Sequence, residues 1–143
     1  MNKGYPNIVY DDLKIGEALL RYLKYLFGFE KVYLNPLRDP FKFRDALEMA
    51  EKSDFLLVDA FIDDKATGFQ FSRQMSKKTL LLFYQRELDI EYEGSFWLIL
   101  PYKLNHLGEK IKKMMNQSAT ISSEYEKLEK RFPVLSKSKG HHI

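Results

Sequence analysis

Residues 55–59 have the sequence Phe-Leu-Leu-Val-Asp, and this short run decides how the rest of the chain is interpreted. Four consecutive apolar residues before an acid predict a short strand, buried on both faces, that ends at Asp59. A second run, Asn-Ile-Val-Tyr at residues 7–10, is followed in the same way by Asp11 and Asp12. Ligands bind at the carboxyl ends of strands in an open parallel sheet, so these three acids are candidate site residues if the two strands are neighbours.

Strand-like and helix-like patterns alternate along the chain. Further strands are predicted at residues 31–34, 79–84 and 95–100, and apolar residues at helical spacing follow every strand except the one at 79–84. Such alternation implies a parallel sheet joined by right-handed crossovers. We therefore expect an α/β fold, a flavodoxin-like three-layer sandwich with a five-stranded parallel sheet in the order 2-1-3-4-5. In that order strands 1 and 3 lie side by side.

Two parts of the chain do not fit this alternation of strands and helices. Residues 85–94 show no convincing helix, and their alternating apolar residues suggest an extended segment. Near the C-terminus, Ser123 and Glu126 form a capping box that opens a helix with a narrow apolar stripe, ended by Pro133. We expect a flavodoxin-like domain over residues 1–117 and, over 118–143, an appended short helix with a frayed basic tail from Ser136 onward. That helix either docks on the core or contacts a partner.

Composition narrows the functional classes. The 143 residues are 45% hydrophobic and 30% charged, which fits one globular domain with a single core. There is no Cys, so disulfides, thiolate metal sites and Cys nucleophiles are excluded. No apolar stretch approaches the ~18–20 residues of a membrane span, and no signal-peptide pattern opens the sequence, so we expect a cytoplasmic protein without membrane contact.

The charge gives little support to nucleic-acid binding. The formal net charge is +3, and most of the excess lies from Lys103 onward. A solvated helix face explains these residues better than a surface for nucleic acid or an acidic partner does.

The three acids suggest metal chemistry. Neighbouring carboxylates repel one another unless a cation or protons intervene, and Mg²⁺ is commonly held by one or two carboxylates with water. Asp11, Asp12 and Asp59 are therefore candidate Mg²⁺ ligands. With a metal in place, an Asp oxygen can attack a phosphoryl group and form an acyl phosphate. The competing interpretation of Asp11 and Asp12 is a helix N-cap, and Asp63 and Asp64 are best explained as solvated loop residues.

Four segments together resemble the receiver domain of response regulators over about residues 7–115. They are Tyr-Asp-Asp at 10–12, Asp-Phe-Leu-Leu-Val-Asp at 54–59, Gly-Phe-Gln-Phe-Ser-Arg at 68–73 and Leu-Ile-Leu-Pro-Tyr at 98–102. The resemblance implies that Asp11 and Asp12 bind Mg²⁺ and that Asp59 is the phospho-acceptor.

The chain departs from the receiver pattern at functionally important positions. Receivers have a Lys before the Pro that follows strand 5, where this chain has Leu100, and a Ser or Thr at the end of strand 4, where it has Tyr84. The loop from Asp59 to Gly68 is one residue longer than usual, and the fourth helix is missing from the pattern. Without the lysine charge and the hydroxyl, a phosphoryl group has little to stabilise it. We therefore expect a receiver-like signalling or protein-interaction module, and a non-catalytic role is favoured over an enzymatic one.

Two alternatives stay open. Residues 53–68, with the short helix and strand that follow, resemble nucleoside 2-deoxyribosyltransferases, which implies a nucleotide-binding or nucleotide-processing protein. That family has a Glu nucleophile and an Asp where this chain has Ser72 and Ala66. The other alternative is a small adaptor that forms a homodimer through the helix at residues 123–132. In the favoured interpretation and in the adaptor alternative, the expected partner is a protein.

Overall fold

The chain folds around a single parallel sheet. A computed structural model describes residues 6–25, 27–36, 43–63, 65–75, 77–84, 96–100, 103–116 and 122–137. The strands are β1 (Pro6–Tyr10), β2 (Tyr33–Pro36), β3 (Phe55–Asp59), β4 (Lys78–Tyr84) and β5 (Trp97–Leu100). The helices are α1 (Leu13–Tyr25), α2 (Phe43–Lys52), α3 (Thr67–Met75), α4 (Leu104–Met115), α5 (Ser122–Arg131) and α6 (Val134–Lys137). All neighbouring strands are parallel, in the order β2-β1-β3-β4-β5, which confirms the predicted topology.

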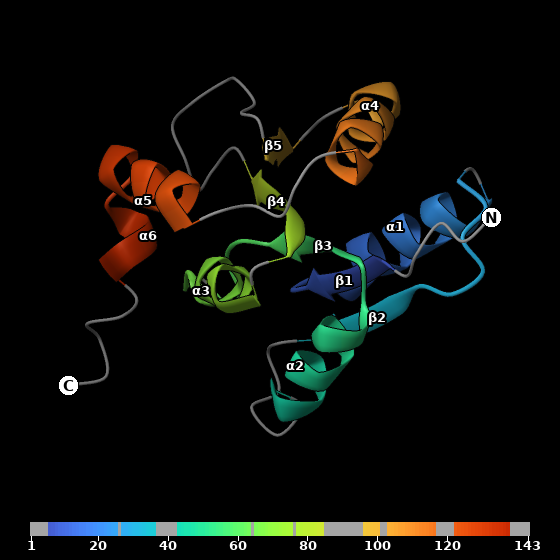
Figure 1. Ribbon diagram of the computed structural model, residues 1–143, viewed down its shortest axis with the longest axis horizontal. Coiled ribbons are helices and arrows are strands. Elements are labelled where there is room, and N and C mark those ends of the chain that lie inside the picture. Colours follow the sequence, from blue (N-terminus) through green and yellow to red (C-terminus); the bar gives the residue numbers. More distant parts are fainter. Residues whose placement is uncertain are drawn as a thin grey trace.

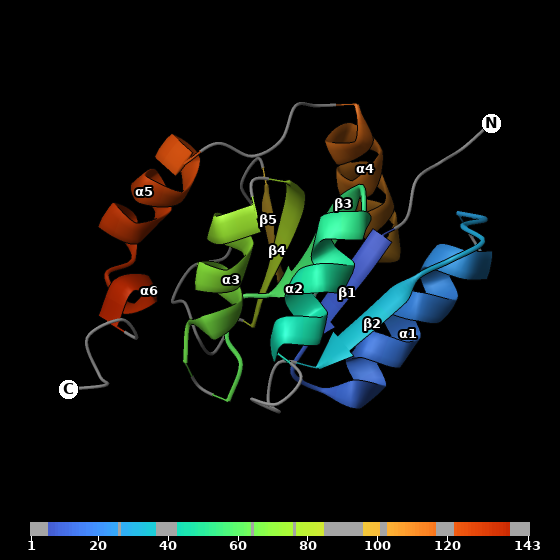
Figure 2. The same ribbon diagram turned by 60° about the horizontal axis from the view of Figure 1, so that its bottom comes forward.

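Helices cover both faces of the sheet. Figure 1 shows α1 and α4 on one face, and α2, α3, α5 and α6 on the other. Turning the molecule brings α2 and α3 in front of the sheet, with α5 and α6 beside α3 (Figure 2). The two faces enclose two separate clusters of buried side chains, so the sheet is the middle of three layers, as a flavodoxin-like sandwich requires.

Alternation along each strand explains why the central runs are apolar throughout. In β3, Leu56 and Val58 belong to the cluster under α2 and α3, whereas Phe55 and Leu57 belong to the cluster under α1 and α4. Successive side chains of a strand point to opposite faces, and both faces of this strand are covered. All five residues of β3 are buried as a result.

The edge strand β2 lies two residues later than the sequence pattern predicts. The prediction ended this strand at Leu34 because Asn35 and Pro36 are poor strand formers, but both residues pair with β1, Asn35 with Val9 and Pro36 with Tyr10. A proline is tolerated at the end of an edge strand because its missing N–H is not needed there. The buried Asn35 amide donates a hydrogen bond to the Asn7 side chain, and this bond gives the polar residue a place in the strand.

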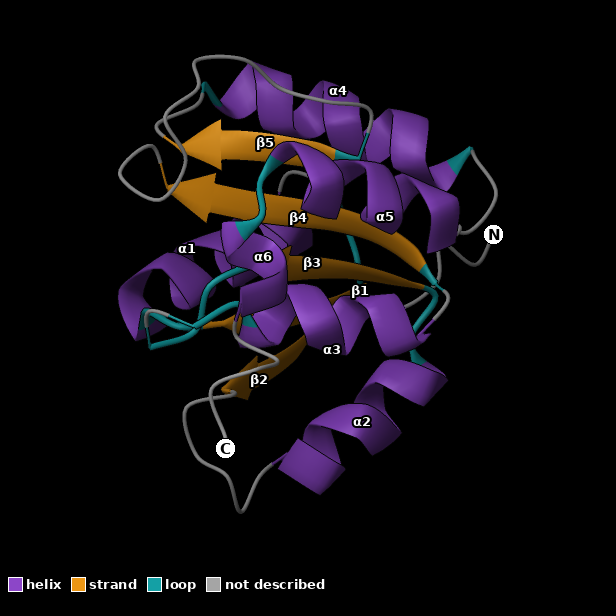
Figure 3. Cartoon of the chain, turned by 90° about the vertical axis from the view of Figure 1, so that its left-hand side faces the viewer, coloured by secondary structure: helices purple, strands orange, loops and turns teal. Residues whose placement is uncertain are grey.

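The C-terminal segment contributes to the core. Tyr125 and Leu128 of α5 and Leu135 of α6 are buried in the cluster under α2 and α3. Figure 3 shows α5 and α6 lying over the sheet next to α3. The sequence prediction of a helix from Ser123 is confirmed, but the frayed tail from Ser136 was wrong at its start because Pro133 is followed by the short helix α6. The buried Leu135 anchors that extra turn.

Some sequence predictions lie outside the described residues. They are the extended segment at residues 85–94, the side chain of Asp64 and the last six residues of the tail. No helix in the described part of the chain has both the length and the apolar character needed to cross a membrane.

Candidate functional site

The carboxyl ends of β1 and β3 meet at one edge of the sheet. β1 and β3 are hydrogen-bonded neighbours, and their register pairs Val9 with Val58. The two acids that follow this pair, Asp11 and Asp59, are therefore carried to the same edge, as the sequence pattern predicts.

Asp59 is the buried member of this pair. Its side chain is almost inaccessible, at 2% exposure. The backbone N–H of Asp11 donates a hydrogen bond of 2.8 Å to Asp59 Oδ2. A buried carboxylate is costly unless hydrogen bonds compensate for the lost water, and this bond supplies part of the compensation. It also ties the end of β1 to the end of β3.

Asp11 extends the connection to the loop after β3. Its Oδ1 accepts a hydrogen bond of 3.0 Å from the backbone N–H of Asp63. Asp63 lies in a tight turn closed by two backbone hydrogen bonds between Ile62 and Lys65, and its φ of 52° is in the left-handed region. Asp and Asn tolerate this region better than most residues. The Asp63 side chain is exposed, as expected for a loop residue, but its backbone is part of the site.

Asp12 has a different role from Asp11. Its exposed carboxylate accepts a hydrogen bond of 2.9 Å at Oδ1 from the backbone N–H of Lys14. This contact satisfies one of the free N–H groups in the first turn of α1, which is the helix-cap interpretation that the sequence left open. The structure thus brings Asp11 and Asp59 into one network and directs Asp12 to α1. In the described part of the chain, no group of three or more His, Cys, Asp or Glu side chains is placed to hold a metal ion.

Gly68 allows α3 to begin directly against the end of β3. A Cβ at this position would lie 1.8 Å from the carbonyl oxygen of Asp59. The next residue, Phe69, donates its backbone N–H to the carbonyl of Ala60 at 2.9 Å. Only a residue without a side chain fits so close an approach.

The ends of β4 and β5 complete this edge of the sheet. The register pairs Tyr84 with Leu100, so the two positions at which the chain departs from the receiver pattern are neighbours. On the other side of β4, Asp59 of β3 is paired with Leu82. The edge therefore carries the acid of β3 but has neither the lysine of β5 nor the small hydroxyl residue of β4 that the resemblance implies.

Comparison with solved structures identifies the fold. The crystal structure of the anti-anti-sigma factor PhyR from Bartonella quintana is similar over 79% of this chain and 48% of that one, at 14% sequence identity and a TM-score of 0.61. The signal receiver domain of a DNA-binding response regulator from Colwellia psychrerythraea covers 79% of this chain and 98% of its own, with 20% identity and a TM-score of 0.53. This chain has the receiver fold.

A further neighbour was crystallised with a protein partner. It comes from the complex of the phosphorylated P1 domain of CheA3 with CheY6 from R. sphaeroides, and matches 81% of this chain and 100% of its own at 17% identity and a TM-score of 0.51. This chain spans about half the length of PhyR and nearly all of the single receiver domains. No protein-family model matches the sequence, and no curated protein matches it significantly.

The second resemblance, to nucleoside 2-deoxyribosyltransferases, gains no support from these comparisons. Ser72 and Ala66, which stand at the positions of that family's acidic residues, are both fully buried. The Ser72 hydroxyl donates a hydrogen bond of 2.9 Å to the carbonyl of Phe69, inside its own helix.

Sequence reasoning missed the partner of Asp11. A backbone N–H donor cannot be recognised from the residue type, and Asp63 had no signal except its position in a polar loop. It also missed Gln70 and Arg73 of α3, which contact the C-terminal helices. Their place among the apolar residues Phe69, Phe71 and Met75 of the same helix was the available signal.

Proposed function

We propose that this protein is a receiver-like signalling module that acts by binding a protein partner and does not carry out phosphotransfer. The observation that carries the proposal is the receiver fold with Tyr84 and Leu100 side by side at the edge next to Asp59. Phosphoryl transfer to a carboxylate depends on preorganised positive charge and hydrogen-bond donors around the transferred group. Leucine supplies neither of them.

The acidic residues support a structural role within this module. The Asp59 carboxylate accepts the Asp11 N–H, and the Asp11 carboxylate accepts the Asp63 N–H. A chain of two carboxylates thus connects β1, β3 and the turn at Ile62–Lys65. We propose that this network holds the edge of the sheet in one conformation for recognition by a partner.

The same pair of acids is compatible with a bound Mg²⁺. One or two carboxylates together with water molecules make up an ordinary Mg²⁺ site. In this proposal Asp11 and Asp59 would be the ligands, and Asp12 remains the cap of α1. A bound cation would neutralise the two neighbouring negative charges and stabilise the edge.

The proposal is tested by acetyl phosphate. Wild-type protein incubated with acetyl phosphate and Mg²⁺ is expected to show no added phosphoryl group by intact-mass analysis. The matched variant is Tyr84→Thr with Leu100→Lys, which places the receiver-type residues at the ends of β4 and β5 and is expected to gain phosphorylation that Asp59→Asn removes. Phosphorylation of wild-type Asp59 would contradict the proposal.

Mg²⁺ is tested separately by thermal unfolding. A bound ion stabilises only the folded state, so the melting temperature should rise with MgCl₂ and not with NaCl at equal ionic strength. Asp59→Asn should remove the rise, whereas Glu48→Gln, on an exposed position of α2, should leave it unchanged. Equal responses of all three proteins would contradict the metal site and leave the protein-binding role intact.

The adaptor alternative, with a homodimer through the helix at residues 123–132, gains no specific support. Tyr125 and Leu128 of that helix are buried within the chain's own core, and Phe132 packs against the same cluster. The residues that α5 leaves exposed, such as Lys127 and Lys130, are polar.

A further inference from the structure

Helix α5 resembles a docked ligand more than an ordinary core helix. Its ten residues are mostly polar, and Tyr125 and Leu128 are its buried hydrophobic residues. Phe132, directly after the helix, is half-buried against the same cluster. A polar helix of this length is not stable in isolation, so docking is what makes it helical.

Its anchors lie against an aromatic surface that we call the α5 groove, formed by Phe69 of α3 and by Phe96 and Trp97 at β5. The ring of Tyr125 packs against Phe69 and Phe96, at centroid distances of 5.4 and 5.2 Å. The rings of Phe132 and Trp97 are nearly perpendicular, and their centroids are 6.4 Å apart. The anchors at 125, 128 and 132 follow the i, i+3, i+7 spacing by which amphipathic helices bind hydrophobic grooves.

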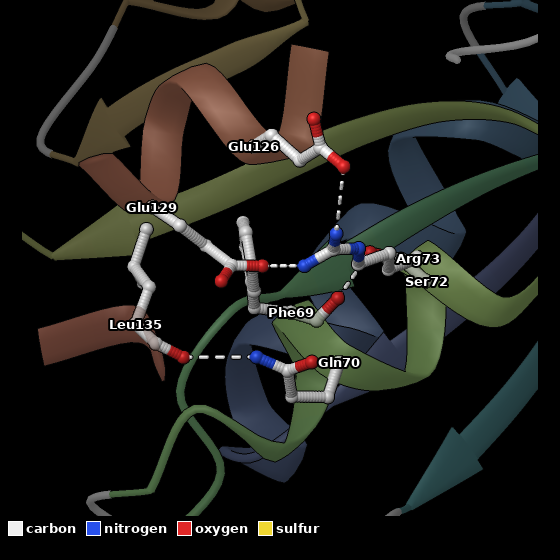
Figure 4. Close-up of polar contacts among 7 residues, drawn as sticks. All are labelled: Phe69, Gln70, Ser72, Arg73, Glu126, Glu129 and Leu135. Carbon is white, nitrogen blue, oxygen red and sulfur yellow. Dashed lines mark hydrogen bonds and ion pairs between the residues drawn. The ribbon is translucent and has the colours of Figure 1, made fainter. Parts of the chain in front are cut away.

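Two polar side chains of α3 contact the C-terminal helices beside the groove, and one of them, Arg73, contacts side chains of the occupant (Figure 4). The Arg73 guanidinium lies between two carboxylates of α5, forming an ion pair with Glu129 and another with Glu126 at 3.6 Å. One helical turn earlier, Gln70 Nε2 donates a hydrogen bond of 2.9 Å to the carbonyl of Leu135 in α6. Arg73 is partly exposed, with 23% of its side chain accessible, so an incoming helix can reach it.

We propose that the α5 groove is a docking site for an amphipathic helix of a protein partner, and that α5 is its intramolecular occupant. The partner helix carries an aromatic residue, a leucine three positions later, and acidic residues one and four positions after the aromatic residue. Tyr125, Leu128, Glu126 and Glu129 define this pattern in α5. Their contacts are made by side chains, so a helix from another chain with the same pattern makes them equally well.

This inference rests on the proposed function in one respect, since both require that the protein acts by binding a partner. The groove is nevertheless separate from the acidic residues at the carboxyl edge. A tethered helix competes at an effective concentration of order millimolar, so a partner helix enters only when it binds tightly or when α5 is weakened.

The experiment uses a fluorescein-labelled peptide of residues 122–137 as the probe and the full chain as the host. Wild-type host is expected to bind the peptide weakly because its own α5 occupies the groove. A host carrying Tyr125→Ala and Leu128→Ala has a weakened occupant and is expected to bind at least tenfold more tightly by fluorescence anisotropy. Trp97 fluorescence and circular dichroism establish that this host remains folded.

A charge exchange tests the site itself. Adding Arg73→Glu to the weakened host should reduce binding of the peptide at least tenfold. A peptide carrying Glu126→Lys and Glu129→Lys should restore binding to that host and bind poorly to the host with Arg73. The control peptide, with Lys127→Ala and Lys130→Ala on the exposed side of α5, should bind as the unmodified peptide does.

Several results would overturn the inference. If the weakened host unfolds, α5 is a part of the core that cannot be displaced. If wild-type and weakened hosts bind the peptide equally, the peptide binds at a site other than the α5 groove. Wild-type dimers that dissociate on adding peptide, measured by sedimentation, would make a second copy of this chain the occupant. Phosphorylation of Asp59 together with specific peptide binding would overturn the proposed function alone and leave the groove intact.

Discussion

The acidic edge, formed by Asp11, Asp59 and Asp63, and the α5 groove both use carboxylates, but they use them differently. At the edge, the carboxylates of Asp59 and Asp11 each accept a hydrogen bond from a backbone N–H of another segment. At the groove, the carboxylates of Glu126 and Glu129 meet the Arg73 side chain. Backbone donors are the same whatever the residue, so the edge depends on the fold. Side-chain donors can be exchanged, so the groove is suited to selecting a partner.

The largest expected effect lies where the two regions join, at the start of α3. Gly68→Ala places a Cβ 1.8 Å from the Asp59 carbonyl oxygen, and neither backbone segment has room to move. We expect a loss of about 3 kcal/mol in the free energy of unfolding, measured with urea. In the control, Gly108→Ala, the nearest atom is the flexible end of Tyr22, at 2.8 Å, and the loss should stay below about 1 kcal/mol. Equal losses of unfolding free energy in the two variants would show that the close approach of Gly68 to the Asp59 carbonyl is not important for stability.

The next effect tests the acidic edge alone. Asp59→Ala leaves the backbone N–H of Asp11 without this acceptor in a buried position, which should cost about 1–3 kcal/mol of folding free energy. Asp59→Asn keeps a side-chain oxygen and should lose less than the alanine variant in the same urea experiment. If both variants lost the same free energy, the carboxylate charge would matter more than the hydrogen bond.

At the groove, removal of the ion pair should have a smaller effect on stability. Arg73→Met keeps most of the aliphatic length and loses the charge that pairs with Glu126 and Glu129. These side chains are partly exposed, so we expect a loss below about 1 kcal/mol in thermal or urea unfolding. If Arg73→Met lost as much free energy of unfolding as Asp59→Ala, the contacts of the α5 groove would be as important for the fold as those of the acidic edge.

The smallest effect is a pH dependence of α5 docking. Burial raises the pKa of the Tyr125 phenol above 10.0, opposed in part by the polar side chains of Ser72 and Thr79 and by the charge of Arg73. The unfolded chain therefore loses this proton first, and the stability from the neutral phenol is present below pH 10.0 and is lost as pH rises through the folded pKa. Wild-type protein should lose stability more steeply than Tyr125→Phe above that pH. If the stability of both proteins fell equally with pH, the Tyr125 phenol would be exposed to water in the folded state.

Local patterns in the sequence predicted much of the site. An apolar run followed by an acid is visible without any tertiary information, and parallel topology then brings the ends of β1 and β3 together. Asp11 and Asp59 were found in this way. The boundary of β2 was wrong because propensity disfavours Asn and Pro, whereas pairing with β1 and the bond between Asn35 and Asn7 outweigh that preference.

By itself, the sequence determined the alternation of strands and helices and the acids that end two strands, because these depend on periodicity and residue type within a few positions. Only the tertiary structure decided that Asp12 caps α1 while Asp11 holds the turn at Asp63, and that α5 docks against Arg73. The contacts of Asp11 with Asp63 and of Arg73 with α5 join segments far apart in the chain. Which donor meets which carboxylate is set by sheet register and helix placement, and neither leaves a local signal in the sequence.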